Sequence, residues 1–524
     1  MKLFTIGDSV SQGFMSLAAA RSDLSYSTLL ACAMGLEIGE EYATPQVPYS
    51  YPEWGAGGLP LNIEAMLRSL NERYGSNLSL FEAPGVLRTI HRVAGETKAY
   101  YETGPGSADL PAPGGIRFFH NVAVQGFDVA DSWLVTSNLC RREIELAQGG
   151  GVEGLVGPGA AFYRTALKVL NPSLNEEYDD FTQMDWLKRH AEGEGVENLV
   201  LWLGANNALG TVISLDINQT PNDGVNKPEE MDHLTRDKVR KWNLWHPADF
   251  KREYETLLRK VDEIMQHNNA NDWKVYVGTV PVITIVPLAK GVGPEAEIDI
   301  ERPVIAPDGT CEEVADKSLY FRYYVWFPLD EDVVQEGGIT PYLTIHDAIH
   351  IDESIRQYNR DIAELVRDLN EAHGYQPQED KSKPPKGKPQ RYYVVDLADA
   401  MQRMAWRRNQ ANPTYEFPDY FKFIYPKVNT KYYYVNARGK LAQGGLFSLD
   451  GVHPSAIAHG LIAHEFIEVM ARAGVEFTKE LDWPKIFAND LLYSEPITLM
   501  QWLYEHEELA ERILDVIQLF RRRD

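Results

Sequence analysis

Five short apolar segments, spread along most of the chain, carry the residue pattern of buried β-strands. Each is rich in β-branched or aromatic residues and is followed by turn residues or by a helical pattern. A near-continuous apolar run such as Leu199–Leu203 is typical of strands that are covered on both faces, as in parallel sheets. The five segments are Leu3–Gly7, Phe118–Val124, Asn198–Gly204, Lys274–Ile283 and Tyr392–Leu397.

Between the predicted strands, apolar residues recur at helical spacing. One stripe predicts a helix with Asp352 as its N-cap; the apolar positions are Ile355, Tyr358, Ile362, Leu365, Val366 and Leu369. A second helix is predicted over residues 455–471, directly after Pro454. This alternation of strands and helices favours an α/β sandwich with a parallel sheet.

The predicted strands lie far apart along the chain, so long insertions are expected in the loops, at about 37–115, 213–250, 290–345, 376–391 and 405–445. Residues 376–391 combine lysines with prolines, which indicates an exposed tether rather than a binding patch. We therefore predict one domain over residues 1–475. Residues 476–524 are predicted to form a C-terminal helical extension packed on it, with an apolar stripe of Leu509, Ile513, Val516, Ile517 and Phe520.

Composition narrows the class of protein. Among 524 residues, 44% are hydrophobic and 24% are charged, which is ordinary for a soluble globular enzyme. The formal net charge of −25 disfavours nucleic acid and anionic membrane surfaces as partners, because both would repel the chain. The longest apolar run, residues 275–289, is interrupted by Pro281 and Pro287 and is too short to span a bilayer, so no stable membrane insertion is expected.

The start of the chain and its cysteines bear on location. Gly7 and Asp8 come so early that they leave no room for the apolar core of a secretory signal. The cysteines are Cys32, Cys140 and Cys311, an odd number without close spacing, so neither a disulfide framework nor a structural zinc site is expected. We expect a cytoplasmic protein; export followed by removal of a signal stays open.

Candidate chemistry begins at Gly7–Gly13 (GDSVSQG), directly after the first predicted strand. A serine at this position presents its hydroxyl at the carboxyl edge of the sheet, where open α/β sheets bind ligands. Its backbone N–H lies at a helix N-terminus, where negative charge is favoured. Ser9 is therefore a candidate nucleophile, and the alternative is that it only caps the helix.

A second motif lies near the other end of the chain, where Asp450 precedes His453 by three residues. The carboxylate can bond one imidazole nitrogen and leave the other free to accept a proton from a serine hydroxyl. The alternative is an aspartate that caps the helix after Pro454, beside an incidental histidine. The spacing indicates a general base and its orienting carboxylate.

Two further positions follow predicted strands. Asn206 comes just after the strand Leu199–Leu203, where its amide could donate to a developing oxyanion, and Gly126 follows Val124, where a backbone N–H could face the same point. Each is also compatible with an ordinary turn residue.

Taken together, these motifs resemble the SGNH, or GDSL, hydrolase superfamily. Supporting matches are Ile355-x-x-Tyr358-Asn359 and Val394–Leu397, and the matching pieces cover about a third of the chain. The resemblance implies a flavodoxin-like three-layer α/β/α sandwich with a parallel sheet of about five strands. It also implies an acyl-enzyme mechanism with Ser9 as nucleophile, His453 as general base and Asp450 as its partner. Gly126 and Asn206 would complete the oxyanion hole with the Ser9 N–H.

This chain departs from the family at Asn207, where an aspartate is usual, which leaves the hydrogen bonding of that loop open. The implied activity is hydrolysis of a carboxylic ester, of a small molecule or carried on a polymer such as an acylated carbohydrate or lipid, without metal or cofactor. An acyltransferase would use the same acyl-enzyme, and a catalytically idle binding or assembly protein is a further alternative. The oligomeric state is not predicted.

One rival is a metal-dependent hydrolase at His346 and His350, which zinc could bridge if both lay on one helix face. Since Asp352 is expected to cap the following helix, we place this pair in a loop. His459 and His464 are five residues apart and are interpreted as core or surface histidines. Aromatic residues over 415–434 and 320–327 are candidates for a substrate groove, and the alternative is that they pack the core of an insertion.

Overall fold

The computed structural model describes residues 1–19, 21–45, 62–76, 83–147, 160–222, 242–326, 329, 331, 334, 341–376, 386–410, 412–425, 427–428, 433–435 and 441–499. At its centre lies a four-stranded sheet with the order β1-β2-β3-β9, in which all neighbours are parallel. The prediction of an α/β fold around a parallel sheet is confirmed. The strands are β1 (Phe4–Gly7), β2 (Asn198–Trp202), β3 (Lys274–Gly278) and β9 (Tyr392–Val395).

The fifth predicted strand, Phe118–Val124, is not formed. Its backbone follows β1, since the Thr5 N–H donates to the carbonyl of His120 (2.9 Å) and the Val122 N–H donates to that of Thr5 (3.0 Å). Regular pairing is reduced to one parallel bridge between Thr5 and Asn121. The reason is local: the N–H groups of His120 and Asn121 both turn to the carbonyl of Ala43, on the other side of the segment.

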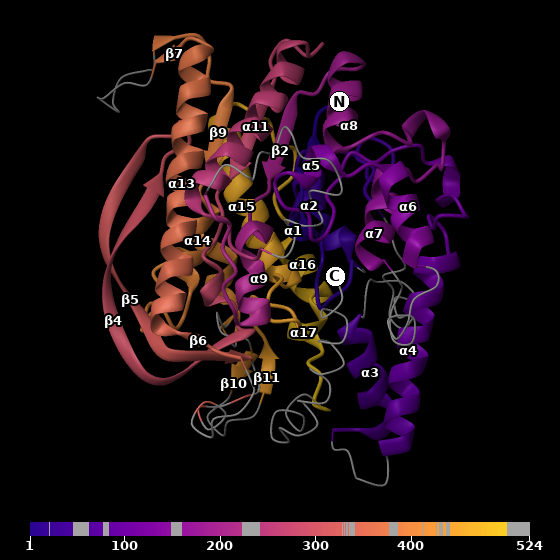
Figure 1. The fold of residues 1–524 in the computed structure, drawn as a ribbon, viewed down its shortest axis with the longest axis vertical. Helices are drawn as coiled ribbons and strands as arrows, with labels where there is room; N and C mark the ends of the chain where they lie inside the picture. Colours follow the sequence, from indigo (N-terminus) through magenta and orange to yellow (C-terminus); the bar gives the residue numbers. More distant parts are fainter. Residues whose placement is uncertain are drawn as a thin grey trace.

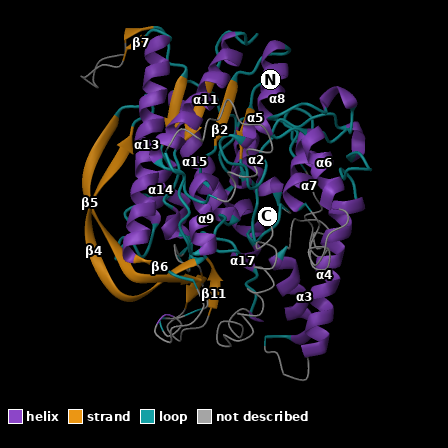
Figure 2. Ribbon diagram, viewed as in Figure 1, coloured by secondary structure: helices purple, strands orange, loops and turns teal. Residues whose placement is uncertain are grey.

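Helices cover both faces of the sheet, as Figure 2 shows. Alternate strand residues divide between two apolar clusters: Ile6, Leu201 and Val277 belong to one, while Val200 and Tyr276 belong to the other. The first cluster includes residues of α8 (Gln183–Glu192), α11 (Pro247–Gln266) and α13 (Ile345–Ala372). The second includes residues of α2 (Tyr26–Ala33) and α15 (Ala456–Arg472), the latter being the helix predicted after Pro454.

Helix α13 begins earlier than predicted. Thr344 is its N-cap and forms a capping box with Asp347, so the helix starts at Ile345 and not after Asp352. Asp352 is instead buried inside the helix, where it accepts hydrogen bonds from Thr284 Oγ1 (2.6 Å) and the Tyr320 hydroxyl (2.8 Å). It also pairs with the buried Arg408 at 3.2 Å. The N-cap expectation was therefore wrong.

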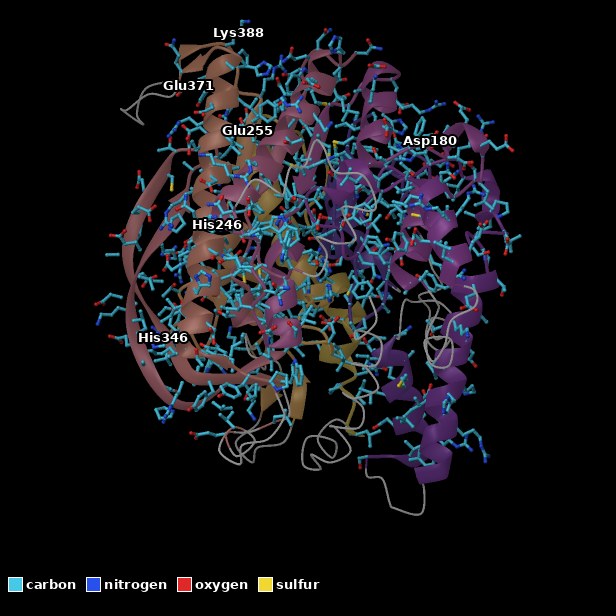
Figure 3. All side chains as sticks on the ribbon, in the orientation of Figure 1. Asp180, His246, Glu255, His346, Glu371 and Lys388 are labelled. Atoms are coloured by element: carbon cyan, nitrogen blue, oxygen red, sulfur yellow. The ribbon has the colours of Figure 1, made fainter. Side chains whose placement is uncertain are left out.

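The histidine pair at 346 and 350 consequently lies on the first turns of α13 and not in a loop. Both side chains are exposed, and Figure 3 shows His346 at the end of α13 close to the long hairpin. Within the described ranges, no three His, Cys, Asp or Glu side chains are grouped so that they could hold a metal ion.

Several of the predicted insertions form strands and helices instead of irregular loops. Residues 290–345 contain a long antiparallel hairpin of β4 (Ala289–Ile305) and β5 (Cys311–Trp326), extended by β6 (Leu343–Thr344). Figure 1 shows this hairpin curving around α13, while α3 (Ile63–Tyr74) and α4 (Ala83–Thr103), from the insertion at 37–115, lie on the opposite side of the molecule. The shorter elements of this side are α5 (Asp131–Leu134), α6 (Ser137–Ala147) and α7 (Ala161–Leu170).

The aromatic insertion packs against the C-terminal segment. Phe421, in the 3₁₀ helix η8 (Asp419–Phe423), contacts Trp483 and Phe487 at ring distances of 5.0 and 5.3 Å. These two residues belong to α16 (Trp483–Asn489), which is followed by α17 (Leu491–Ser494). Small antiparallel pairs join β7 (Tyr375–Gln376) to β8 (Lys386–Gly387) and β10 (Tyr433–Val435) to β11 (Leu441–Gly444).

Three predictions lie wholly or partly outside the described residues: the apolar stripe from Leu509, most of the tether at 376–391, and the middle of the insertion at 213–250. In the part of the chain that the structure describes, no helix combines the length and the apolar character needed to cross a membrane.

Candidate active site

The serine motif forms the turn between β1 and α1 (Ser9–Gln12), a helix that begins at Ser9 itself. Asp8 is the N-cap, and its Oδ1 accepts a hydrogen bond from the Val10 N–H at 3.1 Å. A side chain on Gly7 would collide with Ser11, and Gly13 ends the helix with a φ of 90°, a left-handed conformation that favours glycine. The local sequence therefore holds Ser9 at the carboxyl edge of the sheet, as predicted.

Ser9, His453 and Asp450 form a continuous chain of hydrogen bonds, although 444 residues separate the serine from the histidine. His453 Nε2 lies 2.9 Å from Ser9 Oγ, and His453 Nδ1 lies 2.8 Å from Asp450 Oδ2. Because an ionised carboxylate only accepts hydrogen bonds, Nδ1 carries the proton and Nε2 is the acceptor for the serine hydroxyl. All three residues are buried, with exposed fractions of at most 9%.

Asp450 is held by more than the histidine. Its Oδ1 accepts the N–H groups of Val452 (2.9 Å) and His453 (2.8 Å), and its Oδ2 accepts the N–H of Leu17 (2.9 Å). Burial raises the pKa of this carboxyl, but the charge of His453 and the hydrogen bonds from His453 and Leu17 outweigh burial and hold the pKa below its usual value. The carboxylate is thus fixed in its ionised form.

The contact with Leu17 depends on a strained turn. Ser16 and Leu17 both have positive φ angles, 52° and 56°, in a tight turn closed by a bridge between Met15 and Ala18. Non-glycine residues adopt this conformation at a cost of about 1–2 kcal/mol each, so the surrounding contacts must hold the turn in place. One such contact joins the Ser16 N–H to Ser448 Oγ at 2.8 Å.

The loop that carries Asp450 and His453 is also held by several contacts. An antiparallel bridge joins Phe447 to Pro454, and the Ser448 N–H donates to the carbonyl of His453 at 2.8 Å. The edge of Phe14 packs on the imidazole of His453, with ring centroids 4.7 Å apart. No sequence motif marks Ser16, Leu17 or Ser448 as part of this site. Phe14 has one signal, its position directly after Gly13.

Asn206 is the first residue of α9 (Asn206–Ser214), at the carboxyl end of β2. Its Nδ2 donates to the carbonyl of Phe127 at 2.8 Å and lies 3.4 Å from Asp8 Oδ2. The first bond fixes the amide, and the long second contact leaves its other hydrogen weakly held. Asn206 and Ser9 line the same cavity.

Gly126 precedes Phe127 in the chain and has a φ of 76°. It is absent from the described residues that line the cavity beside Ser9. Among the described residues, the backbone N–H groups of Ser9 and Gly126 donate to no other group. The structure thus brings Ser9, Asp450 and His453 into direct contact, sets Asn206 beside them, and connects Gly126 to Asn206 through Phe127.

Asn207 is the position at which the sequence departs from the family that it resembles, and the structure shows what the asparagine contacts. Its side chain is fully buried, its Oδ1 accepts the Val129 N–H at 3.2 Å, and its Nδ2 donates to Glu253 Oε2 at 3.2 Å. An aspartate here would place a second carboxylate against that of Glu253, which is also fully buried. The amide therefore matches a glutamate contributed by α11.

Asp8 differs from Asp450 in its electrostatics. It is 4% exposed, and burial raises its pKa from 3.8 to about 6, although the Val10 N–H and the charge of His453 act in the opposite direction. Two aspartates that contact the same site are thus shifted in opposite directions. The carboxyl with more hydrogen-bond donors stays ionised, and the one with fewer donors is protonated more readily.

A cavity of about 340 Å³ opens directly beside Ser9, His453 and Asn206. Most of its walls are apolar. Besides residues 8–10 and 202–209, they come from residues 281–291, 397–408 and 446–465. The hairpin contributes Phe321 and Tyr324, so part of the predicted 320–327 groove does line the site. None of the described aromatic residues of 415–434 lines this cavity, which corrects that half of the expectation.

The two histidines of α15 take structural positions. His459 is fully buried, its Nδ1 accepts the Tyr26 N–H at 3.2 Å, and burial lowers its pKa to about 3. His464 is half-buried on the same helix.

No family model, no curated protein and no solved structure matches the chain.

Proposed function

We propose that this protein is a serine hydrolase that cleaves a carboxylic ester, with the SGNH, or GDSL, superfamily as its family. The observation that carries the proposal is the hydrogen-bonded chain from Ser9 Oγ through His453 to Asp450, with separations of 2.9 and 2.8 Å. These are the distances at which a general base can take a proton from a hydroxyl nucleophile.

The first half-reaction forms an acyl-enzyme. Ser9 Oγ attacks the acyl carbon while its proton moves to His453 Nε2, and Asp450 stabilises the imidazolium that results. As the tetrahedral intermediate collapses, the bond between the acyl carbon and the leaving oxygen breaks. His453 returns the proton to that oxygen, so the product leaves as a neutral alcohol.

The negative charge of the tetrahedral intermediate needs donors that are already in place. The N–H of Ser9, at the start of α1, is one candidate, and the side-chain amide of Asn206 is a second. The N–H of Gly126 is the third, two residues after Val124, whose own N–H donates to the carbonyl of Gly7 at 3.2 Å. Each donor of this kind contributes about 3–4 kcal/mol to catalysis.

In the second half-reaction, water attacks the acyl carbon. His453 takes a proton from the water, the bond to Ser9 Oγ breaks, and the proton returns to the serine. The carboxylic acid is released, and Ser9 is restored.

The flavodoxin-like form of the sandwich belongs to the same proposal. The segment 118–124 hydrogen-bonds to β1 on the edge away from β2. If it is counted as the second strand in chain order, the spatial order becomes 2-1-3-4-5, which is the flavodoxin-like arrangement. Ser9 would then follow the strand at which the chain reverses direction across the sheet, where such folds bind their ligands.

Hydrolysis of p-nitrophenyl acetate by the full-length chain tests the proposal, with Ser9→Ala as the inactive variant. Ser11→Ala is a matched control, because Ser11 lies on the same helix but bonds the Tyr26 hydroxyl at 2.7 Å. We expect activity in the wild type and in Ser11→Ala, and a loss of several orders of magnitude in Ser9→Ala. Equal activity in Ser9→Ala would contradict the proposal.

A further inference from the structure

The cavity beside Ser9 is lined mainly by apolar side chains, although the molecule as a whole carries a formal net charge of −25. Ile283, Val286, Met404 and Leu461 belong to its walls and are each less than 9% exposed. Water in such a space makes few hydrogen bonds, so an apolar group that replaces it is favoured.

The space is continuous with the reacting atoms. Asp8, Ser9, Asn206 and His453 form part of the same lining, so a group that enters the cavity reaches Ser9 Oγ without crossing another wall. At about 30 Å³ for each water-sized group, 340 Å³ holds about ten groups of the size of a methylene.

One wall of this space comes from the long hairpin. Ala289, Lys290 and Gly291 of β4 line it, together with Phe321 and Tyr324 of β5. The hairpin is also anchored to the triad loop, since the Leu288 N–H donates to the carbonyl of Gly451 at 3.0 Å. The base of the long hairpin is thus held against the loop that carries Asp450 and His453.

We propose that this cavity binds the acyl chain of the substrate, and that the enzyme selects esters of medium-length, unbranched acyl groups of about eight to ten carbons. This inference rests on the proposed function. The acyl group is assigned to the cavity, rather than the alcohol, because it stays bonded to Ser9 through both half-reactions, whereas the alcohol must leave before water attacks.

The test compares kcat/KM for p-nitrophenyl acetate, butyrate, octanoate and dodecanoate. Each buried methylene contributes about threefold to fourfold, so octanoate is expected to exceed acetate by at least about tenfold in the wild type. Ala289→Phe fills the cavity and should lower kcat/KM for octanoate much more than kcat/KM for acetate, which removes this preference. Ala315→Phe is the matched control, since Ala315 is an exposed residue of the same hairpin.

A second variant keeps the test decisive if Ala289→Phe does not fold. Phe321→Ala removes part of the same wall and enlarges the cavity. It should move the preferred acyl-chain length towards dodecanoate. Equal kcat/KM values for octanoate and acetate in the wild type would overturn the inference. Selectivity that follows the length of the alcohol chain in a series of alkyl acetates would also overturn it. Either result leaves the ester hydrolase proposal standing. If the wild type turned over no ester and its Ser9 did not react with a fluorophosphonate, both this inference and the ester hydrolase proposal would be overturned.

Discussion

The backbone N–H of Leu17 donates a hydrogen bond to Asp450 Oδ2 across 2.9 Å, on the same oxygen that faces His453 Nδ1. The turn that follows α1 therefore holds the carboxylate that contacts His453, although Leu17 and Asp450 are 433 positions apart. Two segments far apart in the chain thus meet at Asp450 Oδ2, the atom that sets the tautomer of His453. Asp450 is oriented by the fold before any substrate binds.

Asp450→Asn tests the role of this carboxylate. The amide can occupy the same space, but it favours the tautomer with the proton on Nε2, which cannot accept the serine proton. We expect kcat to fall by about 10⁴. Asp347→Asn, in the capping box of α13, should leave kcat unchanged. A loss of less than tenfold in Asp450→Asn would show that His453 is oriented by other contacts.

Asn206→Ala removes one proposed oxyanion donor. Because this interaction is expected only in the transition state, kcat should fall by about 10²–10³ while KM changes little. Asn175→Ala removes an exposed side chain and is the control. If KM rises instead and kcat is retained, Asn206 binds the substrate in its ground state and is not part of the oxyanion hole.

Asp8→Asn tests the electrostatics of the N-cap. The pKa of Asp8 is raised from 3.8 to about 6, so the folded chain holds this proton more tightly than the unfolded chain. The contribution of Asp8 to stability is therefore complete below its ordinary pKa and is lost as the pH rises through about 6. An asparagine stays neutral at every pH.

Denaturant unfolding measured at pH values of about 4 and 7.5 checks this sign. Relative to the wild type, Asp8→Asn should gain about 2–3 kcal/mol in the free energy of unfolding between the two pH values. Asp216→Asn, at an exposed position, is the control. A gain that is the same at both pH values would mean that Asp8 does not titrate in this range.

Asn207→Asp tests the pairing of Asn207 with Glu253. The new carboxylate would face Glu253 without the hydrogen bond of the amide, and we expect a loss of about 1–3 kcal/mol in stability. Glu253→Gln in the same chain should restore much of this loss, because a glutamine amide can donate to the aspartate. A double-mutant cycle measures the coupling, and additive effects would contradict the pairing.

The triad could be predicted from the sequence because its residues lie in short motifs at the ends of strands. Ser9 follows β1 directly, and Asp450 and His453 share one loop. The residues that support them have no such signal. Leu17 is a residue type that avoids positive φ, so nothing in the sequence indicates that its N–H would turn towards Asp450.

The parts of the fold that were missed depend on competing local contacts or on long-range assembly. Asp352 looked like a helix N-cap, but the capping box of Thr344 and Asp347 starts α13 about two turns earlier. The strands of the long hairpin carry many charged residues, because much of their surface is exposed, and they therefore resembled a polar loop. The cavity combines several segments far apart in the chain, which sequence patterns alone do not connect.

Reaction of the full-length chain with a fluorophosphonate, followed by peptide mapping, tests the central claim most directly. This reagent phosphonylates a serine only where a base activates its hydroxyl. We expect one modified serine, Ser9, with unchanged labelling in Ser11→Ala and none in Ser9→Ala or His453→Ala. Labelling that persists in Ser9→Ala, or its absence from a folded wild type, would contradict the account of Ser9 as a nucleophile activated by His453.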